Sequence, residues 1–347
     1  MRYICDMAKY RIGILMGGYS SEVEISLLSG QTVFDHLDRQ YFEPYRVHIL
    51  PEGWNVLDTS GELHPINKND FSALINGERI TFDALFNAIH GTPGEDGLLQ
   101  GYLSLLDIPH TSCGAFEAAL TFNKAECNLL LTTLGVRVAP SVLTHSKVDP
   151  AAVREACVKK QLKLPVFVKP SRSGSSFGVS KVDRWDDLPQ ALLFAAKEDN
   201  RLVIEQGVLG TEVGCGIARI KGVPTVLEIT EIIPKKAFFD FEAKYSGASE
   251  EVTPARLPKM VSDEIKSITQ FVYEHLHLRG VVRCDYIVDQ VTQRPVLIEI
   301  NSIPGISPAS IIPQQVAASG RTLSEFFTLL LQETLRDAQD RSFPRVL

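Results

Sequence analysis

The sequence lacks the features of membrane-embedded and secreted proteins. Its apolar runs all fall short of the ~18–20 residues that a membrane-spanning helix needs. Residues 1–18, MRYICDMAKYRIGILMGG, contain no long apolar core followed by a small-residue cleavage site, as a signal peptide would. We therefore expect neither a membrane partner nor a secretory leader.

Cysteine is sparse and lacks the spacing of a metal site. The six cysteines are scattered along the chain and form no C-x-x-C pair. This argues against a zinc site and against a disulfide framework. Scattered cysteines are typical of small buried side chains in a reducing compartment, so we expect a cytoplasmic protein.

The chain also lacks an excess of positive charge. Its net charge of −7 argues against a nucleic-acid partner bound by bulk electrostatics, but leaves room for a local basic pocket. Its 347 residues suffice for two or three domains of about 100–200 residues each.

The stretch around which the chain is organised is 281–305, VVRCDYIVDQVTQRPVLIEINSIPG. Alternation in two β-branched runs, separated by polar DQVTQRP, predicts a β-hairpin. On one face we expect the following residues: Arg283, Asp285 and Ile287 in the first strand, and Leu297, Glu299 and Asn301 in the second.

A turn centred near Thr292 places Asp285 opposite Glu299, and Arg283 opposite Asn301. Facing carboxylates repel each other across a hairpin, and a cation between them removes the repulsion. Two carboxylates and an amide oxygen suit Mg²⁺ or Mn²⁺. The alternative is a strand face that is simply solvated.

The N-terminal part predicts a doubly wound parallel α/β unit. Strand 9–16 is followed by Gly17-Gly18 and a helical pattern, and further strands are expected at 45–50 and 82–88. No G-x-G-x-x-G fingerprint is present, so a dinucleotide site is weakly supported. The loop HGTPGEDG (90–97) follows the third strand, where such sheets bind ligands.

From residue 164 the pattern changes to α+β. A strand ends at Lys169, and loop 171–178, SRSGSSFG, forms the tip of a hairpin rich in N–H and hydroxyl donors. Glu205 ends the strand RLVIE, and a carboxylate there must find donors, either an adenine amino group or a neighbouring lysine. Together with Lys124 and a hard-metal site, these features indicate phosphoryl transfer, although most single lysines are merely solvated.

From residue 211 antiparallel strands are expected, with a long irregular stretch at 233–255 that is suited to cover a ligand. Ser262 is expected to cap a helix reaching Leu276. A helix should start near Ser307, and Thr322 with Glu325 should form a capping box.

The order of five motifs resembles the D-alanine–D-alanine ligase family of the ATP-grasp superfamily. The motifs are GGYSSEVEIS (17–26), HGTPGEDG (90–97), VKPSRSGSS (168–176), FDFEAKY (239–245) and RCDYIV…IEINSIPG (283–305). The resemblance implies a three-domain α/β and α+β fold, in which two ATP-grasp domains clamp the nucleotide. We expect a doubly wound substrate-binding domain at 1–112, a central ATP-grasp domain at 113–208 and a C-terminal one at 209–347.

The resemblance also implies ATP and two Mg²⁺ (or Mn²⁺) ions as cofactors. The metal ligands would be Asp285, Glu299 and Asn301, with Glu299 bridging. The implied nucleotide contacts are Lys124, Lys169 and Lys244, loop 171–178 with Ser175 and Ser176, Glu205 and the Gln206 and Val208 backbone at adenine, and Glu212 at the ribose.

For the substrates, the resemblance implies that Glu22 binds the ammonium of the first D-alanine. His90 and Arg283 would lie near substrate carboxylates, and the helix after Gly305, with Ser310 and Ile311, would bind the second D-alanine. Arg283 and the Gly305 N–H would stabilise the tetrahedral oxyanion. Tyr245 and Ser175 would link to Glu22, and 235–252 would be the lid.

The implied reaction is ATP-dependent formation of D-alanyl-D-alanine through a D-alanyl phosphate, for peptidoglycan precursor synthesis, by a homodimer. Positions 239 and 241 are Phe where many relatives carry Tyr, so those hydroxyls cannot be essential here. Two alternatives stay open: a ligase with a D-lactate or D-serine acceptor, and a silent nucleotide-binding protein on the same scaffold.

Overall fold

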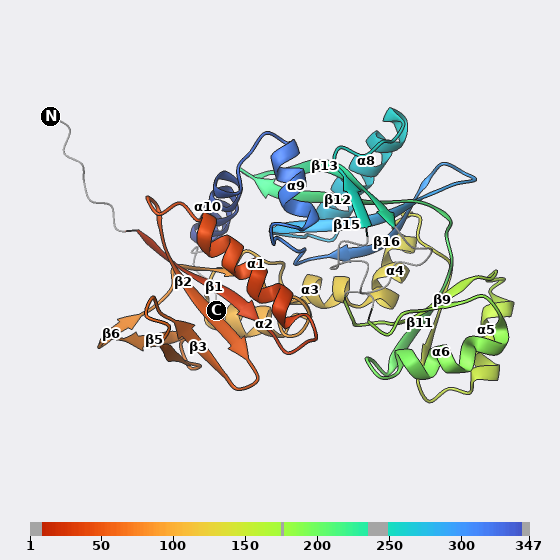
Figure 1. The fold of residues 1–347 in the computed structure, drawn as a ribbon, viewed down its shortest axis with the longest axis horizontal. Helices are drawn as coiled ribbons and strands as arrows, with labels where there is room; N and C mark the ends of the chain where they lie inside the picture. The colour runs from red at the N-terminus through yellow and green to blue at the C-terminus, as the bar shows by residue number, and fades with distance from the viewer. Residues whose placement is uncertain (1–8, 175–176, 235–248, 342–347) are drawn as a thin grey trace.

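The chain is built on three β-sheets, seen side by side in Figure 1. The structure is a computed structural model and describes residues 9–174, 177–234 and 249–341. Within these ranges, every helix is too short or too polar to cross a bilayer. Successive sheets along the chain have seven, four and five strands.

The N-terminal sheet combines a parallel core with an antiparallel extension. Strands β1 (Tyr10–Gly17), β2 (Phe42–Leu50) and β7 (Ala84–Asn87) are parallel, as predicted. The antiparallel strands β3 (Gly53–Leu57), β4 (Leu63–Asn67), β5 (Ser72–Ile75) and β6 (Glu78–Ile80) extend it in the order β6-β5-β4-β3-β2-β1-β7. These four strands were not predicted, because strands of three to five residues give too short an alternation to detect.

Helices cover both faces of this sheet, as a doubly wound unit requires. Helix α1 (Val23–His36) buries Val33 against Ile12 and Met16 of β1. On the other face, α2 (Leu98–Leu105) buries Leu99 beside Leu15. The loop 90–97 joins β7 to α2, so it lies at the carboxyl end of the parallel strands.

The middle sheet is antiparallel, with β8 (Ser141–His145), β9 (Val166–Pro170), β10 (Ser180–Val182) and β11 (Arg201–Gln206) in the order β10-β9-β11-β8. Helices α5 (Pro150–Lys159) and α6 (Leu188–Ala195) share its core, and the 3-10 turn η1 (Trp185–Asp187) precedes α6. The predicted hairpin around loop 171–178 is confirmed, since Ser180 pairs with Val168.

The third sheet carries the focal hairpin. Its strands are β12 (Gly210–Ile220), β13 (Val223–Pro234), β14 (Ser249–Val252), β15 (Val281–Asp289) and β16 (Pro295–Asn301), in the order β14-β13-β12-β15-β16. Helices α3 (Ala115–Phe122), α4 (Lys124–Thr133) and α8 (Lys259–His275) contribute to the core on one side of it. Helices α9 (Ile311–Ala318) and α10 (Leu323–Arg341) contribute to the core it shares with the N-terminal sheet.

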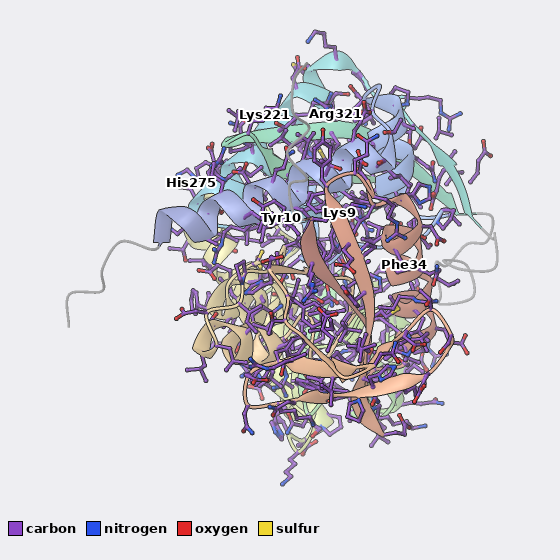
Figure 2. The ribbon with its side chains drawn as sticks, turned by 90° about the vertical axis from the view of Figure 1, so that its left-hand side faces the viewer. Lys9, Tyr10, Phe34, Lys221, His275 and Arg321 are labelled. Atoms are coloured by element: carbon purple, nitrogen blue, oxygen red, sulfur yellow. The ribbon has the colours of Figure 1, made fainter. Side chains whose placement is uncertain are left out.

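Helix α10 joins the first sheet to the third. Phe326, Phe327 and Leu331 of this helix are fully buried in one cluster with Ile12 of β1 and Ile220 of β12. Figure 2 shows α10 crossing the molecule between these two sheets. This shared core fixes the loops of the N-terminal unit relative to the focal hairpin.

The predicted hairpin register is confirmed, because Asp285 pairs with Glu299 and Arg283 pairs with Asn301. A β-bulge follows Asp285, so Tyr286 pairs with Leu297 and Leu297 joins the core. Our placement of Leu297 on the polar face was therefore wrong, since an extra residue in one strand reverses the alternation beyond it.

Helix starts were predicted with mixed success. Helix α8 begins at Lys259 after Pro258, so Ser262 lies inside the helix and is not its cap. Helix α9 begins at Ile311 with Ser310 at the N-cap, later than the predicted Ser307. The capping box is confirmed, because the Glu325 N–H donates to Thr322 Oγ1 at 3.2 Å and the Thr322 N–H donates to Glu325 Oε2 at 2.8 Å.

Candidate active site

Two cavities meet at the focal hairpin. One, of about 500 Å³, is lined by the middle and third sheets, and the other, of about 440 Å³, is lined by the N-terminal unit and the third sheet. Asp285 and Glu299 line both cavities, as do Glu212 and Ile232. A group bound between the two carboxylates is therefore in reach of ligands in either cavity.

The facing carboxylates are balanced by cations from two elements. Arg283 Nε and Nη2 donate to the two oxygens of Asp285 at 2.6 and 2.8 Å, and Asn301 Nδ2 donates to Asp285 at 2.9 Å. Lys124 Nζ lies 3.5 Å from Glu299 Oε2. The alternative of a solvated strand face is wrong for Asp285, which is only 7% exposed.

The donor set fits a hard divalent cation. Asp285 and Glu299 offer carboxylate oxygens, and Asn301 offers an amide oxygen once its side chain turns its nitrogen away from Asp285. The positive charges of nearby Lys124 and Arg283 favour a bound phosphate, and phosphate oxygens are the further ligands that Mg²⁺ prefers. Asp285, Glu299 and Asn301 are the three metal ligands that were predicted from the sequence.

The first cavity is lined by the predicted nucleotide residues of the described ranges. Its described lining includes Lys124, Lys169, Glu205, Gln206, Val208 and Glu212. Apolar side chains such as Phe167 and Ile287 complete its wall. Lys181 is a third lysine in the lining. A pocket with apolar walls, three lysines and a few convergent polar groups suits a phosphorylated aromatic ligand.

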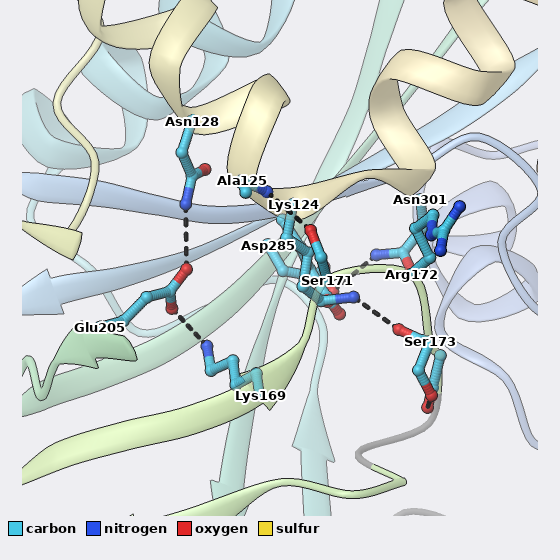
Figure 3. Close-up of polar contacts among 12 residues, drawn as sticks. Lys124, Ala125, Asn128, Lys169, Ser171, Arg172, Ser173, Glu205, Asp285 and Asn301 are labelled. Atoms are coloured by element: carbon cyan, nitrogen blue, oxygen red, sulfur yellow. Dashed lines mark hydrogen bonds and ion pairs between the residues drawn. The ribbon is translucent and has the colours of Figure 1, made fainter. Parts of the chain in front are cut away.

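A buried ion pair crosses this cavity wall (Figure 3). Lys169 Nζ donates to Glu205 Oε2 at 2.5 Å, and Asn128 Nδ2 donates to Glu205 Oε1 at 2.9 Å. Of the two donors considered for Glu205, the structure provides the lysine. Burial lowers the pKa of Lys169, but the charges of Glu205, Glu299 and Glu212 outweigh it, so the pKa is raised and the lysine stays cationic.

Lys124 is held at the start of α4 by the segment that follows β9. The Lys124 N–H donates to the Ser171 carbonyl at 3.0 Å, and Ser171 Oγ donates to Asn123 Oδ1 at 2.6 Å. Lys124 Nζ donates to the Ser173 carbonyl at 2.6 Å (Figure 3). The donor loop and Lys124 are thus one hydrogen-bonded unit at the cavity mouth.

Several predicted residues lie outside the described ranges. They are Ser175, Ser176, Lys244 and Tyr245, together with Phe239, Phe241 and most of the expected lid 235–252. Their roles stay predictions.

The second cavity is lined by the predicted substrate residues. Its described lining includes Glu22, His90, Arg283, Gly305, Ser310 and Ile311, with Asn301 beside them. Gly174 of the donor loop lies against the Glu22 carboxylate, so a Cβ at 174 would require that carboxylate to shift. The two cavities are therefore connected through this loop as well as through the hairpin.

His90 is held as a neutral imidazole. Burial lowers its pKa, although the Glu22 charge acts in the opposite direction. Its Nδ1 lies 2.9 Å from the Ile303 carbonyl, which can only accept, so Nδ1 carries the proton. Nε2 then accepts from Ser29 Oγ at 3.0 Å. His90 thus holds the exit turn of the hairpin against α1.

Glu95 is a buried acid within the motif HGTPGEDG (90–97), and no role was predicted for it. Its Oε2 accepts the Gly91 N–H at 2.7 Å and its Oε1 accepts the Ile303 N–H at 3.3 Å. Burial, together with the Glu22 charge, raises its pKa to about 8. The only sequence signal for Glu95 was its position in a loop rich in charge, because its partner Ile303 is 208 residues away.

The segment after the hairpin leads directly into α9. Ser310 is its N-cap and Ser310 Oγ lies 2.8 Å from Ser307 Oγ. Gly305 faces Ser310, since a Cβ at 305 would lie 2.8 Å from Ser310 Oγ. Ser310 and Ile311 line the second cavity, so the N-terminus of α9 opens into it, and a helix N-terminus favours an anionic group.

Known proteins are similar to this chain in both sequence and fold. Family models described as D-ala D-ala ligase N-terminus and C-terminus match residues 11–113 and 130–332. A D-alanine--D-alanine ligase from Flavobacterium johnsoniae is 44% identical over 324 residues, covering 93% of this chain and 99% of its own. A D-alanine--D-alanine ligase from Flavobacterium psychrophilum is 47% identical over 304 residues, which cover 88% of this chain and 91% of the relative.

Solved structures agree. D-alanyl-alanine synthetase A from Vibrio cholerae has a TM-score of 0.86 and 29% identity, covering 95% of this chain and 99% of its own. VanG D-Ala:D-Ser ligase from Enterococcus faecalis has a TM-score of 0.83 and 28% identity, covering 94% and 99%. The shared fold is thus compatible with more than one acceptor.

The Lys169–Glu205 pair predicts a specific pattern of stability. Lys169→Met leaves the Glu205 carboxylate buried with Asn128 as its remaining side-chain donor, which should lower the free energy of unfolding by about 3–5 kcal/mol. Adding Glu205→Gln removes the uncompensated charge and should recover most of the loss. Urea unfolding of both variants measures this, and an equal loss in the double variant would contradict a charge-pair origin.

Glu95 predicts a pH dependence. Its folded pKa of about 8 exceeds the ordinary value of 4.5, so the folded protein holds this proton to higher pH than the unfolded chain. Its contribution to stability therefore falls as pH rises from about 4.5 to about 8. In urea unfolding at pH 5, 7 and 9, the free energy of unfolding should fall less with rising pH for Glu95→Gln than for wild type. The exposed Glu52→Gln is the control, and parallel curves for wild type and Glu95→Gln would refute the assignment.

Proposed function

The chain belongs to the D-alanine–D-alanine ligase family, and we propose that its two cavities hold ATP and the two amino acids on either side of one metal-binding hairpin. It joins two D-alanines into D-alanyl-D-alanine for peptidoglycan synthesis, and ATP becomes ADP and phosphate. The observation that carries the proposal is that Asp285 and Glu299, paired across the hairpin, line both cavities.

ATP occupies the first cavity. Adenine lies near Glu205 and the backbone of Gln206 and Val208, and Glu212 takes the ribose hydroxyls. Lys124 and Lys169 contact the phosphates, and loop 171–178 covers them with Ser175 and Ser176. Lys244 adds a third cation. The two lysines, the two glutamates, Gln206 and Val208 all line the cavity, as do Ser173 and Phe177 of the loop, which supports the arrangement.

Asp285, Glu299 and Asn301 would hold two Mg²⁺ (or Mn²⁺) ions, with Glu299 as the shared ligand. When bound, they neutralise the charge that develops on the transferring phosphoryl group. Lys124 and Arg283, which lie against these carboxylates, share that task from the protein side.

The amino acids occupy the second cavity. Glu22 holds the ammonium of the first D-alanine, while His90 and Arg283 lie beside the substrate carboxylates. The first carboxylate attacks the γ-phosphorus of ATP, the bond to ADP breaks, and an acyl phosphate forms. The neutral amine of the second D-alanine then attacks the carbonyl carbon of the acyl phosphate and forms the C–N bond. The C–O bond to phosphate breaks, and the departing phosphate keeps that oxygen and can accept the proton that the amine loses.

Oxyanion stabilisation and water exclusion complete the mechanism. Arg283 and the Gly305 N–H stabilise the tetrahedral oxyanion, and the N-terminus of α9 with Ser310 and Ile311 binds the second carboxylate. Because an acyl phosphate hydrolyses readily, water must be excluded, and 235–252 serves as the lid. Tyr245 and Ser175 link to Glu22 across the closed site.

The domain limits are 1–112, 113–208 and 209–347, and the chain acts as a homodimer in the cytoplasm. The five described cysteines are free and buried, which supports a reducing compartment. The VanG structure motivates D-serine as a second acceptor candidate, whereas the curated relatives at 36–47% identity carry the D-alanine name.

Phosphate release from ATP tests the function directly. With Mg²⁺ at pH 7–9, D-alanine should drive release, and D-lactate or D-serine added as acceptor beside D-alanine should yield little mixed product. Glu299→Gln should lower turnover by at least roughly 100-fold, beyond the range for residues that only support a metal ligand. Glu274→Gln, an exposed position on α8, is the matched control.

Two results would overturn the proposal. Absence of D-alanine-dependent release in wild type would remove the ligase assignment. Wild-type turnover in a folded Glu299→Gln variant would remove the hairpin from the metal site.

A further inference from the structure

The second cavity is lined by many more acidic than basic side chains. Among the described residues that line it, Arg283 is the only lysine or arginine. The lining carboxylates are Glu22, Glu95, Glu212, Glu251, Asp285 and Glu299. A cavity with this excess of acids suits ligands that bring positive charge, such as metal ions and ammonium groups.

Five of the six carboxylates already have a task. Glu95 accepts two backbone N–H groups, and Asp285 and Glu299 form the metal pair. Glu212 is shared with the nucleotide cavity, and Glu22 is assigned to the first D-alanine. Glu251 is the acid for which the reaction described so far has no use.

Glu251 lies beside the start of α9. It sits on β14, where it pairs with Ile232 of β13, and its Oε2 accepts a hydrogen bond from Gln314 Nε2. Gln314 stands three residues after Ile311, so both lie on the same side of the first turn of α9. Gln314 and Ser310 also line this cavity.

The surroundings of Glu251 favour a further positively charged partner. Burial raises its pKa, while the Gln314 hydrogen bond and the Arg283 charge act in the opposite direction. An ionised carboxylate has about four acceptor positions, so one amide donor leaves capacity for an ammonium group. Hydrogen bonds between two charged groups are the strong ones.

We propose that Glu251 binds the ammonium group of the second, acceptor amino acid and thereby makes the site prefer an amino acid to a hydroxy acid. The inference rests on the proposed function. The N-terminus of α9 binds the acceptor's carboxylate. Glu251, which is hydrogen-bonded to Gln314 in the first turn of α9, binds the acceptor's ammonium group. A 2-hydroxy acid offers the same carboxylate and no positive charge, so it gains nothing from Glu251.

The test compares three variants. Glu251→Gln removes the charge and keeps the size, and Glu250→Gln makes the same change on the adjacent, exposed residue of β14. Gln314→Met removes the amide that holds Glu251. For each, phosphate release is measured against D-alanine and ATP, and mass spectrometry gives the ratio of depsipeptide to dipeptide formed with D-lactate and D-alanine mixed.

For Glu251→Gln we expect the acceptor KM for D-alanine to rise by about tenfold or more, since a hydrogen bond to a charged group contributes about 1.5–3 kcal/mol. The KM values for ATP and for the first D-alanine should change little, and the depsipeptide share should rise. Glu250→Gln should match wild type, and Gln314→Met should retain the preference for D-alanine.

Two outcomes would overturn the inference. One is a Glu251→Gln variant with an unchanged acceptor KM and an unchanged product ratio. The other is a loss of kcat and Tm in both Glu251→Gln and Gln314→Met without a change in ratio, which would make Glu251 a structural link between β14 and α9. Wild-type phosphate release with D-alanine reports on the proposed function by itself, whereas the product ratio reports on Glu251.

Discussion

The repulsion between Asp285 and Glu299 is the constraint on which the site depends. The hairpin register places the two carboxylates directly opposite each other, where like charges destabilise a sheet. The protein balances them with Arg283 from the same hairpin and Lys124 from α4. The pair therefore attracts positive charge from other elements, and in the proposed function it also binds the metal ions and, through them, the phosphates.

The rest of the fold holds that meeting point between two cavities. The Lys169–Glu205 pair fixes one wall of the first cavity, and Glu95 and His90 fix the exit turn of the hairpin through the Ile303 backbone. Helix α10 packs the first sheet against the third, so these contacts act from a rigid base. One hairpin and its exit turn can thus serve both phosphoryl transfer and peptide-bond formation.

Local patterns in the sequence were sufficient for the hairpin and insufficient for its surroundings. The facing of Asp285 and Glu299 followed from alternation and a short turn, both of which are local. The bulge that sends Leu297 into the core was not predictable, because it depends on packing against β15 and the helices behind it. The same holds for Glu95 and Gln314, whose partners are 208 and 63 residues away.

The central claim is that a divalent cation binds between Asp285 and Glu299 where the two cavities meet. Anomalous scattering from crystals grown with ADP and Mn²⁺ tests it most directly. We predict anomalous peaks within coordination distance of Asp285, Glu299 and Asn301. Nucleotide density in the first cavity without any peak at these residues would contradict the account.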